Sequence, residues 1–146
     1  MTKDVLICVS GLQFELEEDE ALEAVSQGSY YFRNGKHYVT YEEFQEGSNQ
    51  PTNVMLKLSD HKMEMMKKGE TNVHMLFEEG KQHNAMYRVP FGNLLMGINT
   101  TSFKLVETEN EINAEILYGL DINYDHVSDC QIKIRIVSRE MGVEEL

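Results

Sequence analysis

The sequence predicts an all-β protein: a closed antiparallel up-and-down barrel of about eight to ten strands, with little or no helix. Apolar and polar residues alternate with a period of two along most of the chain, which is the pattern of half-buried strands. The links between these segments are short, so consecutive strands are expected to pair with each other. An open sheet of so many strands would leave two exposed edges, and closure removes them. A sandwich of two sheets is the alternative.

The clearest strand lies near the C-terminus, where apolar residues occupy every second position: Ile112, Ala114, Ile116, Tyr118, Leu120, Ile122 and Tyr124. Gly119 is expected to mark a bend in this strand. Residues 125–129 are predicted to link it to a last strand, in which isoleucines alternate from position 132 to position 136. Another strand is predicted over residues 103–107, joined to the long strand through residues 108–111.

Three hairpins are expected earlier in the chain. Asn34-Gly35, between residues 29–33 and 36–41, supplies the two positive φ angles of a type I′ turn and is the strongest hairpin signal. Ser59-Asp60 is the predicted turn between residues 52–58 and 61–68. Residues 79–81 are the predicted turn between residues 72–78 and 82–89.

The N-terminal segment is less regular. Residues 4–17 are predicted to form the first strand, with a bulge at Gly11, where the apolar parity changes from odd to even positions. Leu6 and Cys8 support a competing interpretation without a bulge. Residues 17–20, which are all acidic, form a loop or the first turn of a short helix. Propensity slightly favours a helix over the next residues, but residues 22–27 also suit a strand leading into the first hairpin.

Composition bounds the class of protein. A chain of 146 residues fits one domain, with a core over about residues 4–138 and a C-terminal tail at 139–146. The apolar run near the N-terminus is too short for a signal peptide or a membrane span, so cytoplasmic residence is expected. The net charge of −12 argues against nucleic acid and anionic membranes as partners, and a monomer or weak homodimer is expected. Cys8 and Cys130 are predicted to be reduced thiols, which approach each other only if the first and last strands pair.

Several short motifs in a fixed order resemble the YwiB-like family of bacterial proteins of unknown function, over about residues 5–138. The motifs are Gly28-x-Tyr30, Gly35, Tyr38-x-x-Tyr41-Glu42-Glu43, Met66-x-x-Gly69, Phe77-x-x-Gly80, Tyr87-x-Val89-Pro90-Phe91-Gly92 and Thr100-Thr101. The resemblance implies a lipocalin-like (calycin-type) barrel in a cytoplasmic protein with no established activity. It also implies that residues 22–27 are extended, so a strand is predicted there.

No catalytic or metal signature stands out, and neither an enzyme nor a cofactor is predicted. The five histidines show no ligand spacing, no serine lies in a nucleophile elbow, and neighbouring glutamates point to opposite faces of a strand. Nine methionines, several of them clustered, suit either a soft-metal site or a ligand cavity, but adaptable packing of the core is the favoured interpretation.

The leading functional hypothesis is a non-enzymatic binding module that holds a small apolar or amphipathic ligand inside the barrel. Arg88 or Arg135 would point inward and hold an anionic headgroup. The aromatic residues expected at the same site are Tyr30, Tyr38, Tyr41, Tyr87 and Phe91. The competing hypothesis is a protein–protein interaction or regulatory domain with a filled core and an acidic surface. A hollow interior would favour the first hypothesis, and a packed interior the second.

Overall fold

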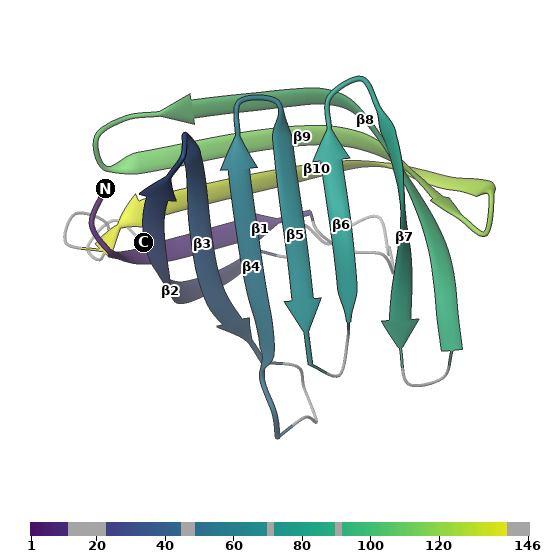
Figure 1. Cartoon of the computed structure of the whole chain (residues 1–146), viewed down its shortest axis with the longest axis horizontal. Coiled ribbons are helices and arrows are strands. Elements are labelled where there is room, and N and C mark those ends of the chain that lie inside the picture. Colours follow the sequence, from purple (N-terminus) through teal and green to yellow (C-terminus); the bar gives the residue numbers. More distant parts are fainter. Residues whose placement is uncertain (12–22, 45–48, 70–71, 90–91, 140–146) are drawn as a thin grey trace.

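The computed structural model describes residues 1–11, 23–44, 49–69, 72–89 and 92–139. All ten of its strands belong to one antiparallel sheet, in the order β6-β5-β4-β3-β2-β1-β10-β9-β8-β7 (Figure 1). The strands are β1 (Asp4–Ser10), β2 (Glu23–Arg33), β3 (Lys36–Glu43), β4 (Thr52–Ser59), β5 (Lys62–Lys68), β6 (Val73–Glu78), β7 (Gln82–Val89), β8 (Gly92–Glu107), β9 (Glu111–Ile122) and β10 (Asp125–Ser138). The predicted antiparallel barrel with essentially no helix is therefore confirmed. Among the described residues, no helix has the length and apolar character needed to cross a membrane.

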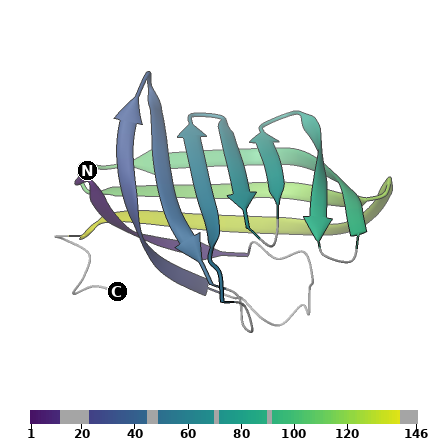
Figure 2. The same cartoon turned by 60° about the horizontal axis from the view of Figure 1, so that its bottom comes forward.

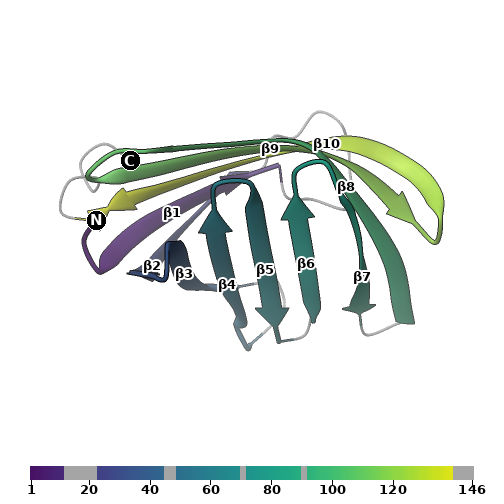
Figure 3. The same ribbon diagram turned by 45° about the horizontal axis from the view of Figure 1, so that its top comes forward.

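The sheet curls until its two ends meet. The long strands β8, β9 and β10 run together with β1 along one side of the barrel, and the shorter strands β3 to β7 cross them steeply on the other (Figures 2 and 3). The first and last strands pair, from Val5↔Ser138 to Ser10↔Lys133. The barrel is completed between β6 and β7, where the isolated bridge Asn72↔Arg88 takes the place of a continuous ladder. We call this β6–β7 boundary the seam.

The sequence pattern located the β2–β3 turn at its observed position and the β4–β5 turn to within one residue. Asn34 and Gly35 have φ angles of 53° and 75° and join Arg33 to its partner Lys36, as a type I′ turn requires. The β4–β5 turn lies one residue later than predicted, at residues 60–61. That shift pairs Leu58 with Met63, and both side chains are fully buried.

The long C-terminal strand also ends earlier than predicted. Asn123 and Tyr124 have φ angles of 50° and 74° and form a second two-residue turn, where Tyr124 is 85% exposed. The predicted link over residues 125–129 is instead the beginning of β10, with a register shift between His126 and Ser128. This bulge breaks the alternation and makes the strand resemble a loop in the sequence.

Strand β8 was underestimated for the same reason. Only residues 103–107 were predicted as a strand, whereas β8 has 16 residues. A register shift between Thr100 and Ser102 changes the buried parity from even positions, as at Ile98, to odd positions, as at Phe103. The even-numbered half of the strand was therefore out of phase with the half that the pattern identified.

The N-terminal predictions divide into three. In β1 the odd positions Val5, Ile7 and Val9 are buried, which rejects the competing phase of Leu6 and Cys8. The proposed continuation of this strand over residues 12–17 and the acidic segment at 17–20 lie outside the described residues. Residues 23–33 form β2, so the extended structure implied by the family resemblance is confirmed over 23–27, and the helix favoured by propensity is wrong there.

Side chains from each of the ten strands fill the inside of the barrel. Phe77 of β6 meets Tyr118 of β9 edge-on, with 5.1 Å between ring centroids, across the interior. The fully buried side chains around them include Leu56, Leu58, Met63, Met65, Met75, Met96, Ile98, Ile116, Leu120 and Ile132. Four methionines thus pack in the core as predicted, but Met55, Met66 and Met86 occupy positions on the outer face.

The two cysteines are unlinked. Cys8 lies opposite Arg135, and Cys130 lies opposite Tyr118. These two positions on β10 are separated by five residues, about 16 Å along an extended strand. They also point to opposite faces, so pairing of the first and last strands does not bring the thiols together.

Candidate functional site

The seven residues predicted to bind a ligand do not surround one cavity. Tyr38 lies on the outer face, where its ring stacks on Tyr31 at 4.7 Å and Lys57 Nζ lies 5.4 Å from the ring centroid. Tyr87 is half-buried against the core, and Arg88 is exposed beside the seam. Phe91 lies outside the described residues. Whether any of these residues binds a ligand stays a prediction.

Arg135 was predicted to point inward, but it lies on the outer face. It occupies an outer position between the buried Ile134 and Ile136, and its Nε lies 2.5 Å from Glu111 Oε1. Hydrogen bonds from Arg135 and Asn113 lower the pKa of Glu111 below its ordinary value. Arg135 lines an outer groove of about 360 Å³ with Cys8, Lys104 and their neighbours.

Tyr30 does point inward, but its hydroxyl is occupied. It lies 2.8 Å from His37 Nδ1, and His37 Nε2 lies 2.6 Å from Glu107 Oε2. Burial, and secondarily the Glu107 carboxylate, raise the pKa of Tyr30. The three residues tie the β2–β3 hairpin to the end of β8. Both ring nitrogens of His37 are occupied by these contacts, so we interpret the three residues as a structural link between the hairpin and β8, which we call the clasp.

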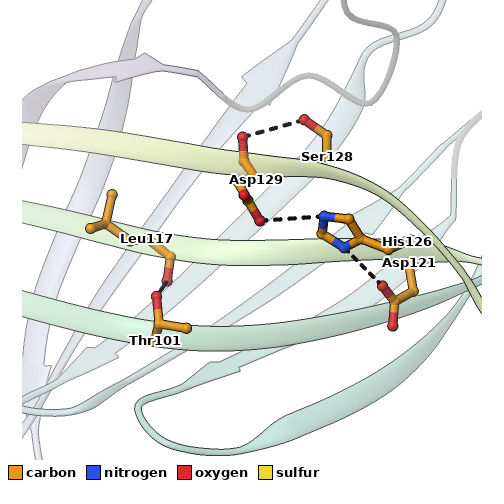
Figure 4. A network of polar contacts seen from close by, with 6 residues as sticks. All are labelled: Thr101, Leu117, Asp121, His126, Ser128 and Asp129. Atoms are coloured by element: carbon orange, nitrogen blue, oxygen red, sulfur yellow. Dashed lines mark hydrogen bonds and ion pairs between the residues drawn. The ribbon is translucent and has the colours of Figure 1, made fainter.

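Another histidine, His126, lies between two carboxylates on the outer face of β9 and β10 (Figure 4). His126 Nδ1 is 3.3 Å from Asp121, and His126 Nε2 is 3.4 Å from Asp129. The hydroxyls of Thr101 and Ser128 donate to main-chain carbonyls, so neither is positioned as a nucleophile for this imidazole. In the part of the chain that the structure describes, no group of three His, Cys, Asp or Glu side chains is placed to hold a metal ion.

A groove larger than the one beside Arg135 lies where β2 separates from β3. Their ladder runs from Arg33↔Lys36 only to Gly28↔Tyr41. Beyond that point β2 follows β1, to Ser10↔Glu23, while β3 follows β4, to Glu43↔Thr52. A groove of about 710 Å³ occupies this fork and extends over the outer face of β4 and β5. We call it the fork groove.

Gly28 allows the two strands to separate in this way. A Cβ atom at this position would lie 2.4 Å from the Thr40 carbonyl oxygen and 2.5 Å from Ile7 Cδ1. Since both distances are far inside van der Waals contact, no side chain fits there without movement of the backbone. The strands therefore approach closely at Gly28, immediately before they part.

The lining of the fork groove is amphipathic. Six of its residues are apolar or aromatic: Val25, Tyr41, Phe44, Val54, Met55 and Met66. Gly28 and the polar residues Ser26, Gln27, Ser29, Thr40 and Asn53 complete it with the charged Glu42 and Lys68. Tyr41 is the only predicted site residue in this lining; burial, with a smaller contribution from Glu43, raises the pKa of its phenol. Glu43 itself forms an ion pair with Lys67, with 2.8 Å between Glu43 Oε1 and Lys67 Nζ.

Most of the other residues of the groove lining escaped prediction because they lie on the outward parity of their strands, whereas a ligand was expected inside the barrel. Met55 lies between the buried Val54 and Leu56, and Met66 directly follows the buried Met65. Both methionines are apolar residues at strand positions where alternation predicts a polar one, and this departure from the pattern could have revealed the groove. Met55 and Met66 are direct cross-strand partners, so the signal marks one place on the outer face.

A smaller groove of about 370 Å³ adjoins the fork groove and reaches the seam. Its lining is Met66, Lys67, Lys68, Asn72, Val73, His74, Met86 and Arg88. Met66 and Lys68 line both grooves, which are therefore continuous across β5. We call this one the seam groove. The fourth groove, of about 400 Å³, surrounds His126.

Comparison with known proteins supports the fold and the family resemblance. Residues 7–134 match a family described as "Domain of unknown function (DUF1934)". The uncharacterized β-barrel protein YwiB of Bacillus subtilis (strain 168) is 26% identical over 119 residues, which make up 80% of this chain and 79% of YwiB. The crystal structure of the ywiB protein from Bacillus subtilis matches with a TM-score of 0.77 and 21% identity, over 93% of this chain and 92% of that chain, and shows the same fold. The resemblance predicted from the motifs is confirmed.

Proposed function

Because the chain belongs to the DUF1934 family, whose function is unknown, we propose from its own geometry that it is a small-ligand-binding protein whose site is the fork groove. The ligand is a small apolar or amphipathic molecule. We place it on the outer surface of the barrel, between β2 and the outer face of β3, β4 and β5, and not inside the barrel. The observation that carries this proposal is the groove itself, with its volume of about 710 Å³ and its lining of apolar side chains beside polar groups.

The size and lining of the fork groove suit such a ligand. Small-molecule sites typically have volumes of roughly 300–1,000 Å³, lined by apolar side chains with a few polar groups that fix orientation. The exposed Phe44, at 75% exposure, and Val25, at 54%, are apolar groups that a ligand would remove from water. By contrast, the inward positions around Phe77 and Tyr118 are occupied by packed side chains.

The proposal is for a carrier or sensor and not for an enzyme. The histidine groups that resemble catalytic arrangements lie away from the fork groove: His37 in the clasp and His126 on β9–β10. We also propose cytoplasmic residence, no bound cofactor, and no nucleic-acid or membrane partner. The unlinked cysteines and the net charge of −12 support these proposals. A likeness to lipocalin-type barrels would be one of architecture, with the ligand site moved to the outer surface.

A ten-carbon amphiphile provides the test. The protein is titrated with decanol and with decanoate by calorimetry, and native mass spectrometry checks for a molecule retained through purification. Gln27→Trp fills the groove from an exposed position on β2, and Gln131→Trp makes the same change on the exposed face of β10.

We expect both amphiphiles to bind the wild-type protein, and Gln27→Trp to weaken both at least tenfold while Gln131→Trp leaves them within twofold. Binding of neither amphiphile, with no retained molecule, would reject the proposal in favour of an interaction domain with a filled core. Equal binding by both tryptophan variants would place the ligand elsewhere.

A further inference from the structure

The seam groove is lined by an unusual number of basic side chains. The chain has 25 acidic and 13 basic residues, yet the described lining of this groove contains Lys67, Lys68, Arg88 and His74 and no acidic residue. Two of the four are occupied: Lys67 pairs with Glu43 at 2.8 Å, and His74 Nε2 contacts Glu64 at 2.5 Å. Within the described part of the chain, Lys68 and Arg88 have no carboxylate partner.

The sheet register brings Lys68 and Arg88 to opposite sides of one residue. The pairing Lys67↔Val73 places Lys68 beside Asn72 across the β5–β6 turn, and Asn72 bridges to Arg88 through two main-chain hydrogen bonds of 3.3 and 3.1 Å. All three residues belong to the outward parity. Lys68 and Arg88 therefore stand two strand spacings apart, about 10 Å between main chains, on the same face.

Side chains of this length converge easily over that distance. Asn72 itself is occupied, because its amide nitrogen donates to the Gly69 carbonyl at 2.9 Å. It therefore supports the turn between the two basic residues and leaves the space above it to them. An anion above Asn72 would receive a forked pair of hydrogen bonds from the guanidinium and one from the ammonium group.

We propose that Lys68 and Arg88 form an anion site, and that it holds the carboxylate or phosphate headgroup of the ligand whose apolar part lies in the fork groove. This inference rests on the proposed function and specifies its ligand as an anionic amphiphile. Met66 and Lys68 line both grooves. The alkyl chain of a ligand whose headgroup is in the anion site can therefore run over Met66 into the fork groove and stay in contact with the protein.

The row of residues next to the basic pair supports this orientation. Thr40, Met55, Met66 and His74 are successive cross-strand partners on the outer face of β3, β4, β5 and β6. Met86 of β7 lines the seam groove with Met66 and His74. The methionines thus form an apolar band that lies two residues along the strands from Lys68 and Arg88. Flexible thioether side chains adapt to an alkyl chain of varied shape.

Charges near the site set its selectivity. Glu42, two strands from Lys68 in the row Glu42–Asn53–Lys68, also lines the fork groove. Its carboxylate opposes an anion placed deep in the fork and favours one placed at the seam. Ligands with a cationic head would meet Lys68 and Arg88 and are excluded by the same arrangement.

The test compares decanoate, decyl phosphate, decanol and inorganic phosphate on the full chain. Lys68→Gln and Arg88→Gln remove the two charges. Their matched controls are Lys104→Gln and Arg33→Gln, which remove exposed charges on β8 and β2 outside the two grooves. Thermal melts check that all four variants are folded.

We expect decanoate and decyl phosphate to bind the wild-type protein more tightly than decanol, with a preference that declines as salt is added. Lys68→Gln and Arg88→Gln should each weaken the two anions about fivefold or more and leave decanol within twofold. The control variants should leave all three within twofold.

Three outcomes would overturn the inference. Decanol bound as tightly as decanoate, with no effect of Lys68→Gln or Arg88→Gln, would reject the anion site while the proposed function stands. Equal losses in the control variants would assign the preference to overall charge. Inorganic phosphate bound as tightly as decyl phosphate would make this a site for a free anion and not for a headgroup. If no amphiphile of either kind binds, the proposed function itself fails.

Discussion

The β8–β9–β10–β1 wall and the β6–β7 seam close the same barrel in different ways. In the wall, ladders run without a gap in the sheet, from Met96↔Ile122 to Glu107↔Ile112 and from Val5↔Ser138 to Ser10↔Lys133. At the seam, the ladder is reduced to the Asn72↔Arg88 bridge. At the other end of the two strands, the β6–β7 turn forms main-chain hydrogen bonds of 2.9 and 3.2 Å with Thr100 of β8.

The side chains beneath the two regions do not differ in this way. Met75 and Phe77 of β6 are as fully buried as Ile116 of β9. The seam is therefore held by packing of side chains, whereas the wall has packing and main-chain hydrogen bonds together. The wall is therefore the more extensively hydrogen-bonded part of the barrel. The fork groove and the seam groove lie on the β2–β7 side, where β2 separates from β3 and where the ladder between β6 and β7 is interrupted.

The largest expected effects come from the core beneath each region. Met75→Ala and Ile116→Ala should each lower the free energy of unfolding by about 2–5 kcal/mol, because each leaves a cavity in a filled interior. Urea unfolding curves measure both. A loss under about 1 kcal/mol for Met75→Ala beside a full loss for Ile116→Ala would mean that the seam strands are not part of the cooperative core.

The fork gives the next largest effect. Gly28→Ala places a Cβ atom against the Thr40 carbonyl and Ile7, and should cost about 1–3 kcal/mol and weaken binding of decanol. Gly119→Ala is the matched control, because its Cβ atom would meet nothing closer than His126 Cε1 at 3.6 Å. Equal stability of the two variants would contradict the close approach at the fork.

Hydrogen exchange measures the seam directly. Amides of β7 that face β6 have no ladder partner outside the Asn72↔Arg88 bridge in the described residues, whereas the β9 amides lie between two ladders. We expect the β7 amides that face the seam to exchange at least tenfold faster than those around Ile116, a difference of roughly 1.4 kcal/mol or more in opening free energy. Equal protection of the two sets of amides against exchange would contradict an interrupted ladder at the seam.

The smallest effect is electrostatic and belongs to the wall. The folded-state pKa of Glu111 is lowered, chiefly by Arg135, so its contribution is present above the ordinary carboxyl pKa and lost as the pH falls through the lowered value. Glu111→Gln should therefore cost at most about 1 kcal/mol near pH 7 and nothing in strong acid. Thermal melts across this range check the sign; a cost that grows toward low pH would contradict it.

The two regions also differ in how far the sequence predicts them. Simple alternation was sufficient for β3 and most of β9, where buried and less buried positions alternate along the strand without interruption. It failed at β8 and β10, because the bulges at Thr100–Ser102 and His126–Ser128 change the parity within a strand. A pattern method sees the two halves of such a strand as unrelated segments.

The candidate site was harder to predict than the fold. The fork depends on where the β2–β3 ladder ends, which is decided by pairing with β1 and β4 and not by residues near Gly28 in the sequence. The sequence predicts Arg88 as a residue that holds an anionic headgroup, but its proximity to Lys68 follows from a bridge across the seam. Arg135 was assigned inward although its parity is that of the outer face, which alternation with Ile134 and Ile136 already indicated.

Methionine methyl groups offer the most direct test of the proposal that the ligand lies outside the barrel. Met55 and Met66 line the fork groove, while Met63, Met65 and Met75 are fully buried on the inside. Carbon-13 methyl spectra recorded during a titration with decanoate should show the resonances of Met55 and Met66 shifting toward saturation while those of the three interior methionines stay in place. Shifts at Met63, Met65 and Met75 with Met55 and Met66 unchanged would place the ligand inside the barrel and contradict the account.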